Sequence, residues 1–270
     1  DIESFSYSKI QKPIYALTFS IQKGDNIYVG KQALKEVVQY VPSTKMYSYV
    51  QEERVFHKEH IGKYSAKIKS VLDCIEDSNG IILIYSQYLD SGLVPMALAL
   101  EEMGLNRLGE NGNLLHKESP AKSFNGKYAM ITGDKQFSVS NSKELQIINH
   151  KSNVNGEKCK VVLISQAGSE GIDFKHLRQV HILDPWFNLN RIDQIIGRAI
   201  RNCSHHGLPL KQRNCQIFLH ASKSNDDREC ADMMVYRIAE AKAKKIGKVQ
   251  KLLKSISVDC ILNATQQNFS

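Results

Sequence analysis

The segment at residues 193–202 (DQIIGRAIRN) sets one glutamine and two arginines among isoleucines. Gln194, Arg198 and Arg201 stand at positions i, i+4 and i+7, so on a helix they share one face. The opposite face is apolar and consists of Ile192, Ile195, Ile196 and Ala199. Paired guanidinium groups on one face suit an anion. The spacing is equally typical of an amphipathic helix with a solvated basic face.

The elements around this segment alternate between helix and strand from residue 65 onwards. Apolar periodicity predicts helices over residues 65–77, 93–104 and 141–150. Short apolar runs predict strands over residues 81–86, 127–132, 160–165, 180–184 and 216–220. Such runs are typical of strands buried on both faces, so we predict an α/β fold with a parallel sheet flanked by helices. We expect Glu101 and Glu102 on the solvated face of the second helix.

The periodicity divides the chain into three parts. Residues 1–62 are predicted to be a small β-rich lead-in, in which two β-rich runs over 13–30 flank the turn sequence KGDN. Residues 63–224 contain the alternating units. Residues 225–270 are predicted to form a basic helical extension that either follows nucleic acid or presents a solvated face.

The bulk composition narrows the class of protein. The chain has 270 residues, a net charge of +8 and a pI of about 9.1, which favours a polyanionic partner. No apolar run is long enough to cross a bilayer, so we predict no membrane partner. Six scattered cysteines without a CxxC motif favour a reducing, intracellular compartment. Because the chain begins DIESFSYSKI, without an initiator Met or a signal peptide, we expect a piece of a longer protein.

Small and polar residues follow each predicted strand. Gln87 follows the first strand, Gly133 and Asp134 follow the second, and the sequence QAGSEGID follows the third. Because ligands of open α/β sheets bind beyond the carboxyl ends of the strands, these residues predict a phosphate-binding rim. Glycines in such loops let backbone N–H groups approach an anion closely.

The rim lacks the remaining parts of a nucleotide site. A P-loop requires GxxxxGK[ST], and the nearest match, GDNIYVGKQ at 24–32, has the wrong spacing and no hydroxyl at its end. The histidines and cysteines near residues 203–215 match no zinc pattern, so we predict no metal site. The rim is therefore expected to complete a nucleotide site whose other half is held elsewhere.

Several motifs in series resemble those of superfamily 2 helicases. QIIGRAIR (194–201) resembles motif VI, SQAGSEGIDF (165–174) resembles motif V, and IILIYSQYLDSG (81–92) resembles motif IV. MITGD (130–134) resembles the Thr-Gly element between motifs IV and V, and DPWFNLNRIDQ (184–194) resembles the segment before motif VI in Swi/Snf-type members. The resemblance covers about residues 65–220 and implies the second of two RecA-like domains.

The resemblance also implies residue roles. Arg201 matches the arginine finger that stabilises charge on the transferred phosphate, Arg198 matches a second phosphate-facing arginine, and Gln194 orients the group. Gly171 and Asp173 match motif V positions near the ribose and the domain interface, which completes the ATP-binding set. The positions that match nucleic-acid backbone contacts are Ser86, Gln87, Thr132, Gly133, Ser165, Gln166 and Ser169.

The resemblance further implies cofactors and partners. ATP and Mg²⁺ would be held mainly by a first RecA-like domain that this chain does not include. The substrate would be nucleic acid, with DNA favoured over RNA. Similarity to transcription-associated helicases of large DNA viruses, poxviruses included, implies transcription factor subunits or RNA polymerase as partners and the virion and host cytoplasm as the location. The alternative is a catalytically inactive, helicase-like scaffold that binds nucleic acid or protein.

Overall fold

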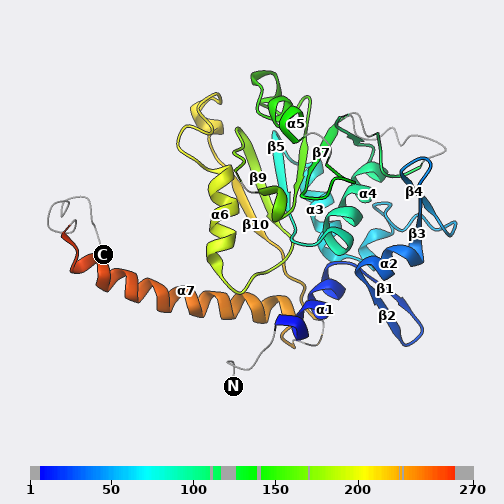
Figure 1. The fold of residues 1–270 in the computed structure, drawn as a ribbon, viewed down its shortest axis with the longest axis horizontal. Coiled ribbons are helices and arrows are strands. Elements are labelled where there is room, and N and C mark those ends of the chain that lie inside the picture. The colour runs from blue at the N-terminus through cyan, green and yellow to red at the C-terminus, as the bar shows by residue number, and fades with distance from the viewer. Residues whose placement is uncertain are drawn as a thin grey trace.

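Six parallel strands form the central sheet of the computed structural model (Figure 1). The model describes residues 7–109, 112–116, 126–138, 141–169, 171–224, 226 and 228–258. In spatial order the strands are β10 (Gln216–Leu219), β9 (Leu177–Ile182), β5 (Ile81–Tyr85), β8 (Val161–Ile164), β7 (Lys127–Ile131) and β6 (Asn106–Arg107). The predicted α/β class with a parallel sheet is confirmed.

Helices cover both faces of the sheet. Alternate residues of each central strand point to opposite faces, so Ile82 and Ile84 of β5 join one buried cluster while Ile81 and Leu83 join the other. The first cluster includes α3 (Ala66–Glu76) and α4 (Val94–Met103). The second includes α5 (Asn141–Ile148) and α6 (Leu189–Ala199).

Local sequence signals explain the ends of these helices. Ser65 caps α3, because its Oγ accepts a hydrogen bond of 3.0 Å from the backbone N–H of Ile68. Helix α4 ends at Gly104, whose φ of 107° lies in the left-handed region that favours glycine. A π-helical turn (Leu89–Leu93) leads into α4. The helices predicted over 65–77, 93–104 and 141–150 are thus confirmed to within a few residues.

Glu101 and Glu102 of α4 are buried, so their predicted place on a solvated face is wrong. Glu101 is 0% exposed and accepts hydrogen bonds from the backbone N–H groups of Leu114 and Leu115, at 2.7 and 2.6 Å. Its Oε1 also accepts the hydroxyl of Tyr128 at 2.6 Å. Glu102 pairs with Arg54 and Tyr49. These partners come from distant segments, so the helical pattern of α4 alone does not indicate them.

The lead-in combines helices with two small hairpins. Strands β1 (Ser20–Lys23) and β2 (Asn26–Val29) confirm the hairpin predicted at KGDN. The preceding run was expected to be β-rich, but it lies in α1 (Tyr7–Thr18). Ile10 and Ile14 are one helical turn apart and buried, so packing outweighs the local strand preference of the run. The segment that follows contains α2 (Gly30–Val37), β3 (Val38–Val41) and β4 (Met46–Tyr49).

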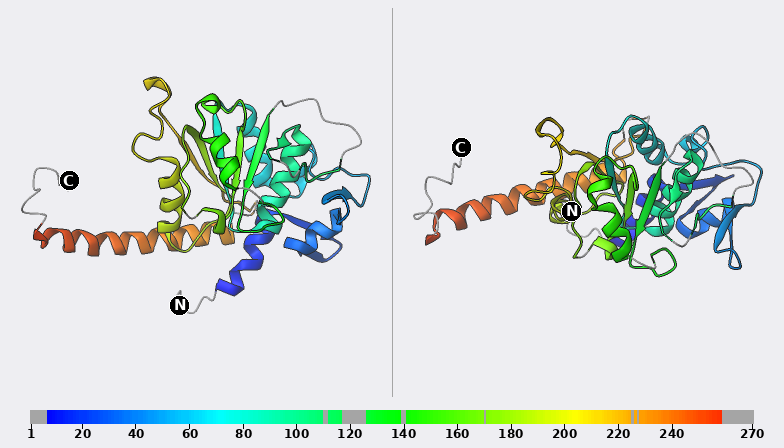
Figure 2. Two further views of the ribbon diagram at one scale, coloured as in Figure 1. Left: turned by 45° about the horizontal axis from the view of Figure 1, so that its top comes forward. Right: turned by 90° about the horizontal axis from the view of Figure 1, so that it is seen from above.

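The chain ends in α7 (Ala231–Ser255), which extends well beyond the sheet (Figure 2). Val235 and Ala239 near its start are buried, whereas residues 244–255 are exposed. A basic helix here agrees with the predicted extension. No helix among the described residues combines the length and apolar character needed to cross a bilayer.

A buried polar network joins α7 to the start of the chain. Lys67 of α3 forms an ion pair of 2.7 Å with Asp232 of α7, and both side chains are almost fully buried. The same Nζ donates to the backbone O of Leu183 at 3.0 Å and to Thr18 Oγ1 at 3.4 Å. Ser222 Oγ donates to the backbone O of Leu17 at 3.1 Å. These contacts draw on all three predicted regions, whose boundaries remain a prediction.

Candidate functional site

Helix α6 contains residues 194–199 of the motif at 194–201. Its first turn is capped by Asn188, whose Oδ1 accepts the backbone N–H of Asn190 at 3.1 Å. Ile192, Ile195 and Ala199 are buried, while Gln194 is exposed on the other side, as the spacing predicts.

Arg201 lies outside this helix. Helix α6 ends at Ala199, and Ile200 leaves the helical region with φ −121° and ψ 77°. A turn follows, in which the backbone N–H of Ser204 donates to the backbone O of Arg201 at 3.0 Å. The prediction that Arg201 shares the face of one continuous helix with Gln194 and Arg198 is therefore wrong.

Both arginines nevertheless meet the same short segment after β8. Arg198 Nη1 donates to the backbone O of Ile172 at 3.0 Å, and its own backbone O accepts the N–H of Phe174 at 3.2 Å. Arg201 Nη1 donates to Asp173 Oδ2 at 2.6 Å. The structure thus brings Arg198, Arg201 and Asp173 together, and their role in ATP binding stays a prediction.

Gly171 and Asn149 both determine the backbone conformation of residues 171–175. Gly171 has a φ of +70°, a conformation that favours glycine. Asn149, just beyond α5, donates from Nδ2 to the backbone O of Asp173 at 2.9 Å and accepts the N–H of Lys175 at 2.9 Å. Sequence reasoning missed Asn149, because one asparagine after a helix carries no distinctive signal.

A second group of predicted residues lines a pocket at the carboxyl ends of β5, β7 and β8. This rim pocket has a volume of about 670 Å³. It brings together Gln87, Gly133, Ser165 and Gln166, each predicted from a different loop or motif position. Lys135 also lines it and is exposed, which adds a cation that sequence reasoning missed. The lysine, the amides and the glycine backbone are groups that bind phosphate oxygens, and Asp134 adds one carboxylate beside Lys135.

Two predicted nucleic-acid contacts have buried side chains instead. Ser86 is 0% exposed, and its Oγ donates to the carboxylate of Asp184. Thr132 is 2% exposed, and its Oγ1 accepts the backbone N–H of Asp134 at 3.2 Å. Each hydroxyl holds a loop in place, and the contact of both residues with nucleic acid stays a prediction. The side chain of Ser169 lies outside the described part of the structure.

The loops that form the rim pocket pack tightly against each other. A Cβ on Gly168 would lie 2.2 Å from the backbone O of Ile131, and a Cβ on Gly133 would lie 2.6 Å from the Cβ of Ala167. Ser165 Oγ accepts the N–H of Gly168 at 3.1 Å. Glycine at both positions is therefore required for the close approach of the loops after β7 and β8.

Asp184 fixes the loop after β5. Its carboxylate accepts the Ser86 hydroxyl, the backbone N–H of Gln87 at 3.0 Å and the Thr18 hydroxyl at 3.3 Å. Burial raises the pKa of Asp184 to about 6, although the nearby Lys67 ammonium lowers it. The role of this residue was missed, because its partners belong to three separate segments.

Other polar residues near the site have structural partners. The guanidinium of Arg191 lies 3.9 Å from the ring centroid of Trp186. His181 is buried within β9 and stacks on Phe218, with 4.5 Å between ring centroids. Among the described residues, no group of three or more His, Cys, Asp and Glu side chains is arranged to hold a metal ion.

Comparison with known proteins identifies related sequences. Residues 66–203 match the family model described as the helicase conserved C-terminal domain. A termination factor NPH-I homolog of African swine fever virus (isolate Pig/Kenya/KEN-50/1950) is 31% identical over 74% of this chain and 33% of its own length. The homolog of the isolate Warthog/Namibia/Wart80/1980 is 30% identical over 95% of this chain and 42% of its own length.

Further matches come from another virus and from a solved structure. A protein of Acanthamoeba polyphaga mimivirus with the provisional name ATP-dependent RNA helicase R563 is 28% identical over 88% of this chain and 40% of its own length. The C-terminal part of the Fun30 ATPase domain matches 68% of this chain and 47% of its own, with a TM-score of 0.43 and 16% identity. The chain thus spans less than half the length of these curated relatives.

Proposed function

Because the chain belongs to the family of helicase conserved C-terminal domains, we propose that it is the second RecA-like half of an ATP-dependent nucleic-acid helicase or translocase. The convergence of Arg198 and Arg201 on the segment at Ile172 and Asp173 is the observation that carries this proposal. Both guanidinium groups lie beside the segment that leads into the amino end of β9, whereas the rim pocket lies at the carboxyl ends of β5, β7 and β8. A phosphate held by a facing domain would meet two cations beside that segment.

The proposed mechanism is closure of two domains. A first RecA-like domain would hold ATP and Mg²⁺, which supply the phosphate to be transferred. On closure, Arg201 would exchange Asp173 for the phosphate oxygens and stabilise the charge that develops on them. Arg198, which holds the backbone O of Ile172, would be the second cation that faces the phosphate. The rim pocket would bind the nucleic-acid backbone through Gly133, Gln166 and Lys135. Each closure would then move this binding site relative to the nucleic-acid-binding site of the first domain.

We also propose a role in viral transcription. Relatives named as termination factors support this setting, as does their viral origin. Transcription factor subunits or RNA polymerase would be the protein partners, in the reducing interior of the virion and the host cytoplasm. DNA is the proposed substrate, but a relative with an RNA helicase name makes RNA a necessary comparison.

The test is nucleic-acid-stimulated ATP hydrolysis by the protein that joins this chain to its first RecA-like domain. Arg201→Ala should lower turnover by ~10³-fold or more, while nucleotide affinity stays within a few fold. Arg228→Ala removes an exposed arginine that pairs with Asp226 and should leave turnover unchanged. Single-stranded DNA, duplex DNA and RNA are compared as activators. Normal turnover by Arg201→Ala would overturn the finger assignment, and no stimulated hydrolysis by the unaltered protein would favour a scaffold.

A further inference from the structure

A second cavity adjoins the rim pocket on the side of the lead-in. It has a volume of about 680 Å³, within the typical range of about 300–1,000 Å³ for ligand cavities. Helix α2 and strands β3 and β4 form one wall, and the loops after β5 and β7 form the other. Leu89 and Asp134 line both this cavity and the rim pocket. A chain molecule bound along the rim could therefore place a side group in the cavity.

The lead-in wall of this cavity is fixed to the body of the fold. The backbone N–H of Tyr47 donates to the backbone O of Leu114 at 2.5 Å, and its O accepts the N–H of His116 at 2.8 Å. Burial raises the pKa of the Tyr47 phenol to about 12, so the hydroxyl stays protonated. The cavity wall that contains Tyr47 is thus hydrogen-bonded to the rest of the fold.

Aromatic and apolar groups line the interior. The rings of Tyr40 and Tyr47 lie 5.2 Å apart between centroids, with 58° between their planes. Tyr47 is buried, whereas Tyr40 is half-buried and keeps part of its surface exposed. Leu34 and Phe137 add apolar surface. Such a surface suits a flat ring, because bases stack on aromatic side chains through their π-faces.

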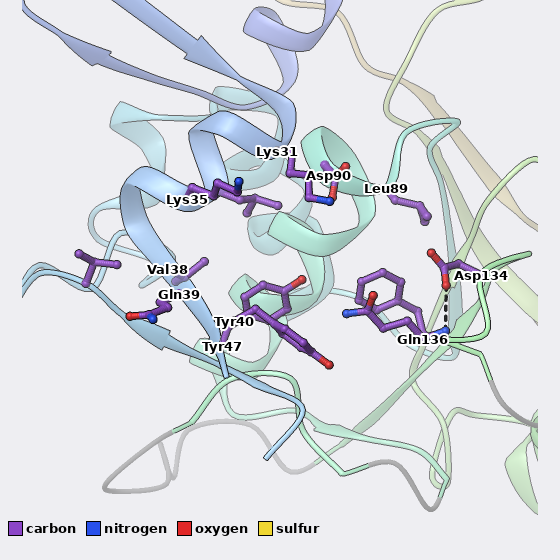
Figure 3. Close-up of a pocket in the computed structure, with 13 residues that line it drawn as sticks. Lys31, Lys35, Val38, Gln39, Tyr40, Tyr47, Leu89, Asp90, Asp134 and Gln136 are labelled. Carbon is purple, nitrogen blue, oxygen red and sulfur yellow. Dashed lines mark hydrogen bonds between the residues drawn. The ribbon is translucent and has the colours of Figure 1, made fainter. Parts of the chain in front are cut away.

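Lysines and carboxylates line this cavity together, and Figure 3 shows Asp90 beside Lys31. Lys31 and Lys35 are exposed and one turn apart on α2, so they lie on the same side of that helix. Asp90 and Asp134 are half-buried, and burial raises the pKa of Asp90, although the nearby Lys31 ammonium lowers it. Figure 3 shows the two lysines on the helix above the cavity and Asp134 on the loop across from them.

The aromatic rings and the carboxylates together favour a nucleobase over an anion as the occupant. Asp90 lines this cavity but not the rim pocket, and its carboxylate would repel a phosphate or an acidic side chain that entered beside it. Carboxylates also accept hydrogen bonds from the exocyclic amino groups of bases. The lysines at the mouth attract the phosphates on either side of the base. An extended strand would therefore enter with its base inward and its backbone outward.

We propose that this cavity receives one unstacked base of the strand whose backbone crosses the rim pocket, with the base against Tyr40 and a flanking phosphate at Lys31 and Lys35. The proposal rests on the proposed function of the rim as a backbone grip. It adds a contact to the bases themselves, made by the lead-in.

The test compares binding of two oligonucleotide probes of equal length and charge to the whole chain. One probe is ordinary single-stranded DNA, and the other is the same backbone with abasic sites throughout. Tyr40→Ala should weaken binding of the ordinary probe by about 5- to 150-fold, the range found when a base-stacking aromatic is truncated. Binding of the abasic probe should not change. Tyr40→Phe keeps the ring and should restore binding of the ordinary probe.

Two further variants separate this proposal from the function of the rim. Gln166→Ala changes the rim pocket and should weaken both probes alike. Tyr28→Ala, on the β1–β2 hairpin, is the matched control and should weaken neither. If the unaltered chain binds neither probe, the backbone grip fails and the base cavity fails with it. If the chain binds both probes but Tyr40→Ala weakens both equally or neither, only the base cavity is overturned. Thermal unfolding of each variant confirms that it is folded.

Discussion

Arg201 donates from Nη1 to Asp173 Oδ2 across 2.6 Å, and both side chains are more than half exposed, at 58% and 51%. An exposed ion pair of this kind contributes only about 0–1 kcal/mol, because water screens both charges. The contact can therefore hold Arg201 near the loop at residues 171–175 without preventing its release to a stronger anion. It contrasts with the Lys67–Asp232 pair, which is almost fully buried.

The first prediction follows from that contrast. Asp173→Ala should change the free energy of unfolding by less than about 1 kcal/mol. Asp232→Ala leaves the Lys67 ammonium buried without its carboxylate and should cost about 3–5 kcal/mol. Urea unfolding of both variants measures the difference. A loss of several kcal/mol in Asp173→Ala would show that the Arg201 contact is structural.

Two glycines of the site should respond in opposite ways to alanine. Gly197 lies inside α6, and a Cβ there meets no heavy atom within 4 Å of the described structure, so Gly197→Ala should raise the free energy of unfolding by about 0.5–1 kcal/mol. Gly168→Ala should lower it, because the new Cβ would collide with the backbone O of Ile131. Denaturant midpoints provide the measurement. The expectation fails if both variants move the midpoint in the same direction.

Glu101 should be indispensable to the fold although it lies far from the arginines. Glu101→Gln replaces one acceptor oxygen by an NH₂ group that faces the donors of Leu114, Leu115 and Tyr128. Leaving a buried donor unsatisfied costs about 1–3 kcal/mol, so we expect a loss of at least ~2 kcal/mol. Glu76→Gln alters an exposed pair with Lys58 and is the matched control. Equal unfolding free energies for the two variants would contradict the assigned role.

Buried histidines should make the protein less stable in acid. Burial lowers the pKa of His181 to about 3 and that of His220 to about 4, from ordinary values of 6.5. Between pH 6.5 and 4 the unfolded chain therefore binds more protons than the folded one, so stability falls as the pH falls through this window. His181 alone should contribute a loss of about 2 kcal/mol between pH 6.5 and 4.5.

Thermal unfolding across this pH range tests the effect. His181→Gln removes the titrating ring and should flatten the dependence of the melting temperature on pH. His116→Gln changes an exposed histidine and should leave the dependence as it is. A profile for His181→Gln that is as steep as that of the unaltered chain would rule His181 out as its source.

The strands of the central sheet could be predicted because each one is marked by its own local run of residues. Strands such as β5 and β8 are unbroken apolar runs, and a capping residue such as Ser65 marks its helix directly. Features that depend on distant partners were not predictable. The helical pattern predicts that Glu101 is solvated, because it contains no sign of the contacts with Leu114 and Leu115.

In the candidate site, too, local signals were predictable and contacts between distant segments were not. The motif order correctly associates Arg198 and Arg201 with Asp173, and the strand ends correctly bring Gln87, Gly133 and Gln166 to one pocket. The periodicity at 194–201 does not reveal that α6 ends before Arg201. Burial of Ser86 depends on Asp184, which lies on a different strand end.

The Lys67–Asp232 pair has a consequence for how the chain is made. As the chain emerges from the ribosome, Lys67 and its helix are complete long before Asp232 has been synthesised. Until then the ammonium lacks the Asp232 carboxylate, the partner with which it forms its buried ion pair, so burial of Lys67 is less favourable. Final docking of α1 and α3 should accordingly be a late, post-synthetic event that waits for the start of α7.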